Sequence, residues 1–308
     1  MRILFTFLLL AVALTTCHAQ KANLMLNLEK GKEYSQVTNS KVTVTQDFNG
    51  IIINMVMTIK GGMSYKVVSV NPSDYDLDVK YDHLSMIMEL PQSQGSMEFS
   101  SESNDEQDVL STALSKMIGK TFHVKMAKNG KILEVKNIES IMELLFDDFT
   151  HIPENQLEQY KAQITNAYGA EAYKGSIEMA TAIFPDNPVN IGDKWTIETN
   201  IESNISALLT TEYELTEWGS DYAMIKGNSV IVTADKESYI ESNGMPVKFD
   251  LTGSMISEIK VDKETGWIIE ATINQEIKGD VYIKENPQMP EGMKIPMIMK
   301  NEMTTTDK

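Results

Sequence analysis

The 308-residue chain contains one β-rich pattern twice, on either side of a helical middle, and this repetition constrains its fold more than any other feature. The first copy opens with Gly31-Lys32-Glu33-Tyr34 and the second with Gly192-Asp193-Lys194-Trp195. Each copy continues through strand-like runs to a Ser-Asp-Tyr triplet, at residues 73–75 and 220–222. An internal repeat of this kind indicates that two similar sheets, or two halves of one sheet, share a core.

The N-terminus has the pattern of an export signal. Arg2 precedes an apolar run from Ile3 to Leu14, and Cys17-His18-Ala19 fits the small-x-small rule for cleavage after Ala19. This run is shorter than the roughly 18–20 apolar residues that span a bilayer, and no later run reaches that length. The sequence therefore predicts a signal peptide over residues 1–19 and a soluble, exported mature chain without a transmembrane segment.

Cys17 has two interpretations. Leu14-Thr15-Thr16-Cys17 loosely resembles a lipoprotein signal, although Thr16 stands where that signal has Gly or Ala. Acylation of Cys17 would make the protein an outer-membrane lipoprotein. If cleavage instead removes Cys17, the mature chain contains no cysteine, and its core alone must stabilise it without disulfides. In that case we expect a periplasmic or extracellular location.

The charge of the chain is strongly negative. Loss of residues 1–19 removes only Arg2 from 27 basic and 44 acidic residues, which leaves 26 against 44 and a net charge of −18. Such a field repels phosphate backbones, so we expect no nucleic-acid partner. Apolar residues make up 42% of the chain and include 20 methionines, which indicates a core or cavity lined by flexible side chains.

Residues 20–136 have the pattern of an antiparallel meander with one helix. Alternating residues flank Asn49-Gly50, which is the strongest short hairpin signal in the chain. We expect Gly61-Gly62 to form a turn and the polar, Ser-rich residues 91–103 to form a loop. Apolar residues at helical spacing predict a helix over residues 104–118.

The remainder of the chain completes an α+β pattern. Residues 137–182 read as helical, and strand patterns return over residues 183–308. Runs of strands around a block of helices predict an α+β fold rather than a βαβ fold. We expect one domain over residues 20–308: a strongly curved, half-barrel-like antiparallel sheet built from two related β halves, with the helical segment packed on its concave side.

The sequence shows no recognisable catalytic machinery. His83, His123 and His151 lie in different predicted elements, and the zincin, serine-hydrolase and phosphate-loop motifs are all missing. We therefore expect no catalytic residue, no enzymatic activity and no cofactor, with a hydrolase of unrecognised type as a less favoured alternative. Asp74-x-Asp76-x-Asp78 starts like a calcium loop, but Val79 occupies the position of the required Gly, so we interpret it as a solvated strand face.

Methionine pairs are the most specific candidate site. Three Met-x-Met pairs, at residues 55–57, 86–88 and 297–299, each place two thioethers on one strand face. Three converging thioethers could bind Cu(I), whereas methionine more often fills a core or lines a cavity. We expect no metal site. The predicted lining of an apolar ligand site is Met55, Met57, Met86, Met88, Leu145 and Phe149.

One segment carries a family resemblance. Phe184-Pro185-x-x-Pro188-Val189-x-x-Gly192-Asp193-Lys194-Trp195, preceded by helices, resembles a family of uncharacterised exported bacterial proteins of about this length. The resemblance covers nearly the whole mature chain, implies no activity, and marks Gly192, Asp193 and Trp195 as structural motif residues. The expected architecture is also similar to half-barrel carriers that shield lipids or lipoproteins in the bacterial envelope, which implies a carrier role by analogy.

These patterns favour a non-catalytic binding or carrier protein for an apolar ligand such as a lipid. The reason is the combination of apolar, Met-rich strand faces with missing catalytic groups. The alternative is an interaction or structural module of the envelope that binds a protein partner through an exposed apolar patch.

Overall fold

The computed structural model describes residues 21–308 except 90, 92–94, 104, 106, 151, 202–205, 243–244 and 287–288. The predicted signal peptide, Cys17 and His151 therefore lie outside the described residues. Within the described part of the chain, thirteen strands form one sheet, and all strand pairs are antiparallel.

The elements follow the predicted order of strands, helices and strands. The first strands and helix are β1 (Glu33–Phe48), β2 (Ile51–Val70), β3 (Asp74–Glu89), β4 (Ser96–Ser100), α1 (Val109–Met117), β5 (Thr121–Ala127) and β6 (Ile132–Lys136). The middle contains α2 (Ile138–Leu144), α3 (Glu154–Tyr168) and α4 (Ala170–Thr181). The last strands are β7 (Lys194–Ile201), β8 (Ala207–Trp218), β9 (Tyr222–Thr233), β10 (Ile240–Ser242), β11 (Met245–Asp262), β12 (Ile268–Ile283) and β13 (Met293–Thr306).

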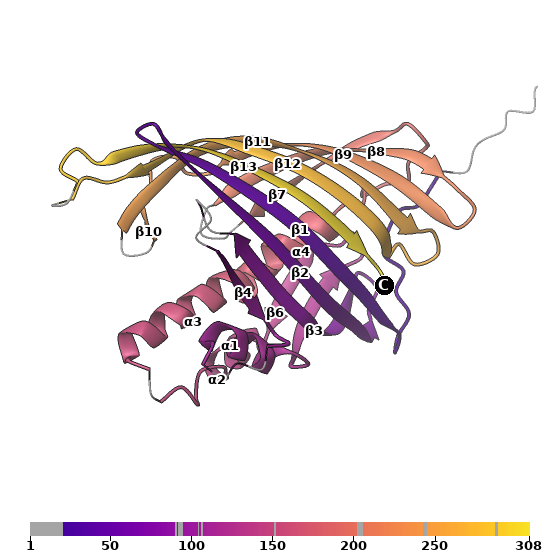
Figure 1. Cartoon of the computed structure of the whole chain (residues 1–308). Coiled ribbons are helices and arrows are strands. Elements are labelled where there is room, and N and C mark those ends of the chain that lie inside the picture. Colours follow the sequence, from indigo (N-terminus) through magenta and orange to yellow (C-terminus); the bar gives the residue numbers. More distant parts are fainter. Residues whose placement is uncertain are drawn as a thin grey trace, which may run out of the picture.

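The sheet is continuous, and its two halves meet where β1 pairs with β13. The strand order is β6-β5-β3-β2-β1-β13-β12-β11-β9-β8-β7, with β4 attached to β3 and β10 to β11. The sheet arches over the helices, which lie on its concave side (Figure 1). The predicted mostly antiparallel, strongly curved sheet is confirmed, and among the described strands its order ends at β6 on one side and at β7 on the other.

The two halves begin with the same hydrogen-bonded turn. Gly31, before β1, and Gly192, before β7, both have positive φ angles, +82° and +87°. The amide of Gly31 donates to the Val67 carbonyl at 2.8 Å, and that of Gly192 donates to the Leu215 carbonyl at 2.7 Å. In return, the Val67 amide donates to the Lys32 carbonyl at 3.0 Å, and the Leu215 amide donates to the Asp193 carbonyl at 3.3 Å.

Turn chemistry explains one predicted hairpin and corrects one predicted turn. Asn49 and Gly50 both have positive φ, as a two-residue hairpin turn requires, and they connect β1 to β2. The predicted turn at Gly61-Gly62 is wrong, because β2 runs through both glycines from Ile51 to Val70. A Cβ at position 62 would overlap the His83 ring, so glycine here allows a close cross-strand approach inside the sheet.

Two other boundaries differ from the sequence-based expectation. The predicted loop over 91–103 contains β4, because Met97 and Phe99 pair with apolar residues of β3 despite their polar neighbours. The predicted helix 104–118 begins only at Val109. The Asp108 carboxylate accepts a hydrogen bond from the Ser111 amide at 3.1 Å and caps that start.

The N-terminal segment closes one end of the curved sheet. Leu24, Leu26 and Leu28 alternate with exposed residues and are at most 5% exposed. Their burial in the main core keeps this segment against both halves of the sheet.

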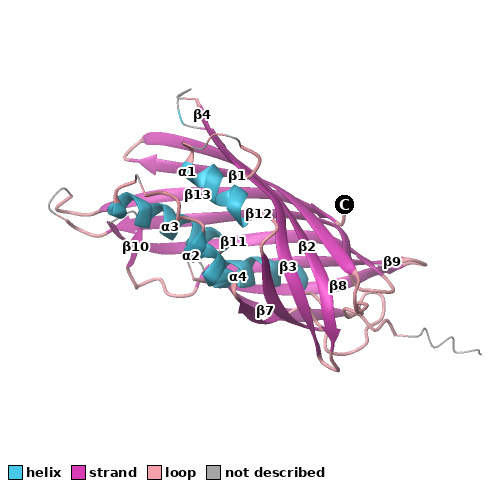
Figure 2. Ribbon diagram, turned by 90° about the horizontal axis from the view of Figure 1, so that it is seen from below, coloured by secondary structure: helices cyan, strands magenta, loops and turns pink. Residues whose placement is uncertain are grey.

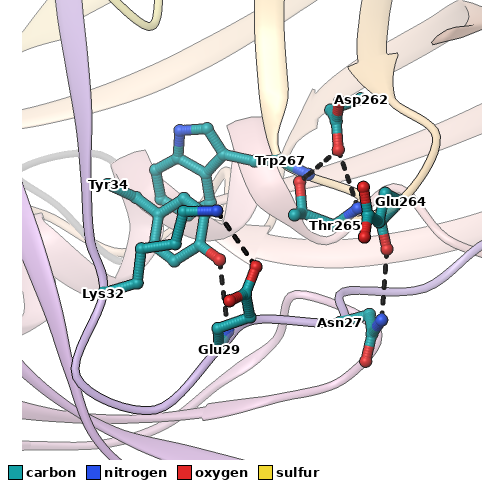
Figure 3. A network of polar contacts seen from close by, with 8 residues as sticks. All are labelled: Asn27, Glu29, Lys32, Tyr34, Asp262, Glu264, Thr265 and Trp267. Atoms are coloured by element: carbon teal, nitrogen blue, oxygen red, sulfur yellow. Dashed lines mark hydrogen bonds and ion pairs between the residues drawn. The ribbon is translucent and has the colours of Figure 1, made fainter. Parts of the chain in front are cut away.

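Polar contacts attach the N-terminal segment to the β11–β12 turn (Figure 3). The Asn27 amide donates to the Thr265 carbonyl at 2.7 Å, and its side chain donates to the Glu264 carbonyl at 3.2 Å. Beside this contact the rings of Tyr34 and Trp267 lie 5.1 Å apart, which joins β1 to the start of β12. The β11–β12 turn thus holds the N-terminal segment that precedes β1.

Helix α4 contacts both end strands of this order, β6 and β7. The Glu178 carboxylate accepts the Ile132 amide of β6 at 2.7 Å, and the Thr181 hydroxyl donates to the Gly130 carbonyl at 2.7 Å. Met179 packs against the core cluster that contains Leu209. Figure 2, seen from below, shows this helix lying across the concave side between β7 and β3.

Candidate apolar binding surface

The candidate site is one face of the sheet, which we call the inner face. Residues paired across strands share a face, so Val42 of β1 lies beside Met57 of β2 and Asn301 of β13, and Met57 lies beside Met88 of β3. The same face includes Met255 of β11, which belongs to the core cluster contacted by α4. The inner face is therefore the side that faces the helices.

The inner face of the five central strands carries no charged residue. This holds for every second residue of β1 (34–48), β2 (51–67), β11 (247–261), β12 (271–283) and β13 (293–305). The alternate positions of the same strands hold the charges, for example Lys294, Lys300 and Glu302 on β13. One face of these strands is thus apolar or neutral, and the other is charged and meets solvent.

The apolar side chains of the inner face differ in exposure along the strands. Close to the N-terminal segment they are fully buried, as Tyr65 and Val67 are at 1% exposed. Toward the β1–β2 turn several apolar side chains of β2, β3 and β13 are only half-buried, whereas Val44 of β1 and Ile295 of β13 are buried. The half-buried members of this part are Ile53, Met55, Met57, Ile59, Met86, Met88, Met297 and Met299.

The structure brings four of the six predicted lining residues together. Met57 pairs with Met88, Met55 with Val44, and Met86 with Ile59, so the four methionines share the inner face. Within the described residues none of the four packs against a core cluster. Flexible thioether side chains at half-buried positions can change rotamer around a bound molecule.

The other two predicted lining residues lie apart from the methionines. Leu145, directly after α2, is 2% exposed, and Phe149 is 4% exposed, and both belong to the main core. Leu145 also borders a pocket of about 470 Å³ between α1 and α2. The Lys116–Asp148 ion pair, 2.8 Å long, lies at this pocket.

Sequence reasoning missed part of the lining. The sequence pattern predicts a loop at Met97, although this residue pairs with Met88 across β3 and β4. The sequence predicts Met297 and Met299 as a pair on one strand face but does not assign them to the same surface as Met55, because only the β1–β13 register shows that Met299 and Met55 flank Val44. The alternation of apolar and polar residues along β13 was the sequence signal that could have assigned Met297 and Met299 to one face.

The motif residues Gly192, Asp193 and Trp195 form the turn that starts β7. The Asp193 carboxylate accepts hydrogen bonds from the backbone and side-chain amides of Asn190, at 2.7 and 3.0 Å. The Trp195 indole donates to the Ile183 carbonyl at 3.0 Å, and its ring stacks on Tyr213. Trp195 also borders a pocket of about 770 Å³ beside the β7 edge, lined by both polar and apolar residues.

The acidic strand residues have local partners. The Asp78 carboxylate lies 2.6 Å from His123 Nδ1, and the Asp76 carboxylate lies 3.6 Å from Lys125. Hydrogen bonds from Ser69 and Asn71 lower the pKa of Asp76. Among the described residues no group of three or more His, Cys, Asp or Glu side chains could hold a metal ion.

None of the helices formed by the described residues is long and apolar enough to cross a membrane.

Comparison with solved structures places the fold near a lipid-associated protein. Lipovitellin, whose structure was described for its lipid–protein interactions, matches 92% of this chain with a TM-score of 0.52 and 9% identity. The chain spans 25% of the length of that protein. At this identity the match concerns the fold alone.

Two weaker structural matches cover most of both chains. An outer membrane channel from Pseudomonas putida has a TM-score of 0.28 and 8% identity, over 91% of this chain and 97% of the other. A DUF1329 family protein from Desulfovibrio piger has a TM-score of 0.15 and 10% identity, over 89% of this chain and 86% of the other.

Sequence comparison identifies the family. No curated protein matches the chain. The sequence model of a family of unknown function (DUF6263) matches residues 72–268, which span β3 to the start of β12. Because this match covers more than half of the chain, the protein belongs to the DUF6263 family.

Proposed function

We propose that this chain is a non-catalytic binding or carrier protein that holds an apolar ligand, such as a lipid, against the inner face of its sheet. One observation carries the proposal: the inner face of the five central strands is uncharged, and toward the β1–β2 turn Ile53, Ile59 and the methionines of β2 and β3 are only half-buried. Soluble proteins rarely expose a large contiguous apolar surface unless it binds something.

The energetics of such a surface suit a lipid chain. Each Å² of apolar surface removed from water contributes roughly 25 cal/mol, so covering about 300 Å² would contribute about 7 kcal/mol before the costs of association. Met55, Met57 and Met88 would share that contact with Ile59 of β2. Because methionine is flexible, one surface could accept chains of different shape.

The likeness to lipovitellin supports the proposal at the level of the fold. That protein was described for its lipid–protein interactions, and it shares the arrangement of strands at 9% identity. The signal pattern of residues 1–19 supports export to the periplasm or cell exterior, and the continuous sheet supports a single domain over residues 20–308.

Native mass spectrometry of the chain, expressed with its leader and purified without detergent, tests the proposal. We expect a reproducible adduct of lipid-like mass that organic extraction removes. Met57→Asp places a charge on the inner face and should abolish the adduct. Thr58→Asp is the matched control, since Thr58 is the next residue of the same strand and faces the opposite side. A bare protein mass for the wild type, or equal adducts in both variants, would contradict the proposal.

A second candidate function is an interaction module of the envelope. Ile51 and Ile52, at the β1–β2 turn, are 61% and 52% exposed, which is unusual for large aliphatic side chains beside one another. A defined oligomer in the same native spectra, lost on Ile52→Ser, whose side chain lies on the face opposite the inner face, would favour this second function over the carrier.

A further inference from the structure

We infer that the ligand of the inner face is an uncharged amphiphile, whose hydroxyl, ester or amide groups hydrogen-bond to a polar patch on β11, β12 and β13. This inference rests on the proposed function and adds the chemical class of the ligand. The patch consists of Asn301, Gln275 and Ser257, which lie on adjacent strands of the inner face.

The sheet register brings the three side chains together. Gln275 of β12 lies directly opposite Asn301 of β13. Ser257 of β11 pairs with Ile273, two residues from Gln275, so Ser257 and Gln275 are diagonal neighbours on one face. Directly paired Cβ atoms are about 5 Å apart and diagonal ones about 7–8 Å, so one polar head can reach all three groups.

The patch has unused hydrogen-bonding capacity. Asn301 accepts a hydrogen bond from the Ser40 hydroxyl at 2.7 Å, and this bond leaves its amide NH₂ as a donor. Gln275 is half-buried, and its side chain has no hydrogen-bond partner among the described residues. Ser257 is 2% exposed, and within the described part of the chain its Oγ is unpaired as well.

Unpaired polar groups on an apolar surface need an explanation. A buried donor or acceptor without a partner costs about 1–3 kcal/mol, so such groups persist where a partner arrives from outside. Gln36, 6% exposed on the same face of β1, likewise has an unpaired Nε2 among the described residues. These groups sit among methionine and isoleucine side chains that suit a hydrocarbon chain.

The charge pattern of the inner face excludes an ionised head group from the polar patch. The inner face of the five central strands offers no cation to a carboxylate or phosphate, and the whole chain carries a formal charge of −17. An ionised group that leaves water without a counter-charge loses far more free energy than a neutral one. A hydroxyl or ester needs only the donors and acceptors that amides and a hydroxyl supply.

Two probes with the same hydrocarbon chain test the inference. Delipidated protein is titrated with monooleoylglycerol, which is neutral, and with oleate at about pH 8, where its carboxyl is ionised. Equilibrium dialysis with radiolabelled probe, below the concentration at which each probe aggregates, gives the two dissociation constants. We expect monooleoylglycerol to bind at least about tenfold more tightly than oleate, because only the ionised head group of oleate loses its hydration without gaining a counter-charge.

A pair of variants assigns the preference to the patch. Gln275→Leu should weaken monooleoylglycerol binding about 2- to 10-fold, the range of a lost hydrogen bond, and leave oleate binding unchanged. Asn274→Leu is the matched control, since Asn274 is the preceding residue and is exposed on the opposite face. Its affinities should equal those of the wild type.

The outcomes separate this inference from the proposed function. Oleate binding as tight as monooleoylglycerol would overturn the uncharged-ligand inference and leave the carrier function intact. Equal monooleoylglycerol affinity in both variants would remove the patch as the recognition element. Binding of neither probe, together with a bare native mass, would contradict the carrier function and the inference with it.

Discussion

The contact between α4 and the β5–β6 hairpin can be tested with one added methyl group. Gly130 lies in that hairpin with a φ of +88°, and a Cβ at this position would overlap the backbone carbonyl of Thr181 in α4. Because the obstacle is backbone rather than a flexible side chain, Gly130→Ala must displace either the hairpin or the helix. The displacement would strain the hydrogen bonds from Thr181 to Gly130 and from Ile132 to Glu178.

The expected loss in the free energy of unfolding is the sum of a conformational cost at Gly130 and a cost of the disturbed contact with α4. Alanine in the left-handed region costs about 1–2 kcal/mol. Overlap in a packed site costs about 1–3 kcal/mol, and part of the two hydrogen bonds is lost as well. We therefore expect Gly130→Ala to lower the free energy of unfolding by about 3–5 kcal/mol.

Gly50 provides a matched control. It also follows an asparagine in a hairpin turn, its φ is +91°, and no atom lies within 4 Å of a Cβ built on it. Gly50→Ala should therefore show the conformational cost alone, about 1–2 kcal/mol.

Equilibrium urea unfolding, followed by circular dichroism, measures both variants. The difference between them, about 2–3 kcal/mol, isolates the contact between α4 and the sheet edge. Equal losses of stability for the two variants would show that α4 does not hold the β6 edge in solution, and would refute this account of how the sheet is closed.

Two further predictions concern buried tyrosines. Tyr75 is fully buried, and its hydroxyl donates to the Leu26 carbonyl at 2.8 Å and accepts a hydrogen bond from the Leu28 amide at 3.2 Å. Tyr75→Phe should therefore lower the free energy of unfolding by about 1–3 kcal/mol and speed limited proteolysis of the N-terminal segment. Unchanged cleavage would contradict this attachment. Burial raises the pKa of Tyr213 to about 12, so its neutral form contributes stability below about pH 10 that is lost as the pH rises toward that value. Ultraviolet absorbance titration of the wild type minus Tyr213→Phe should show this late step, and ionisation near pH 10 would disprove it.

The sequence determined most elements by local chemistry. Asn49-Gly50 predicts its hairpin because both residues tolerate positive φ. The period-two alternation of β2 and β3 assigns a face to each residue, so the placement of Met55 with Met57, and of Met86 with Met88, on single faces could be predicted.

Local rules failed where a neighbouring strand or ring decided the structure. Gly61-Gly62 reads as a turn, but the close approach of His83 keeps it in the middle of β2. The polar residues around Met97 read as a loop, but pairing with Met88 makes β4.

The tertiary structure alone decided which faces meet. The pairing of β1 with β13 joins residues 37–46 to residues 297–306, and no local pattern encodes a register across such a separation. That register places Met297 and Met299 on the same face as the methionines of β2, with β1 between them. The β12–β13 register aligns Asn301 with Gln275, while Leu145 and Phe149 lie in the main core. A single sequence specifies the polarity of each strand face, because side chains alternate, but the surface that several faces form together depends on long-range strand pairing.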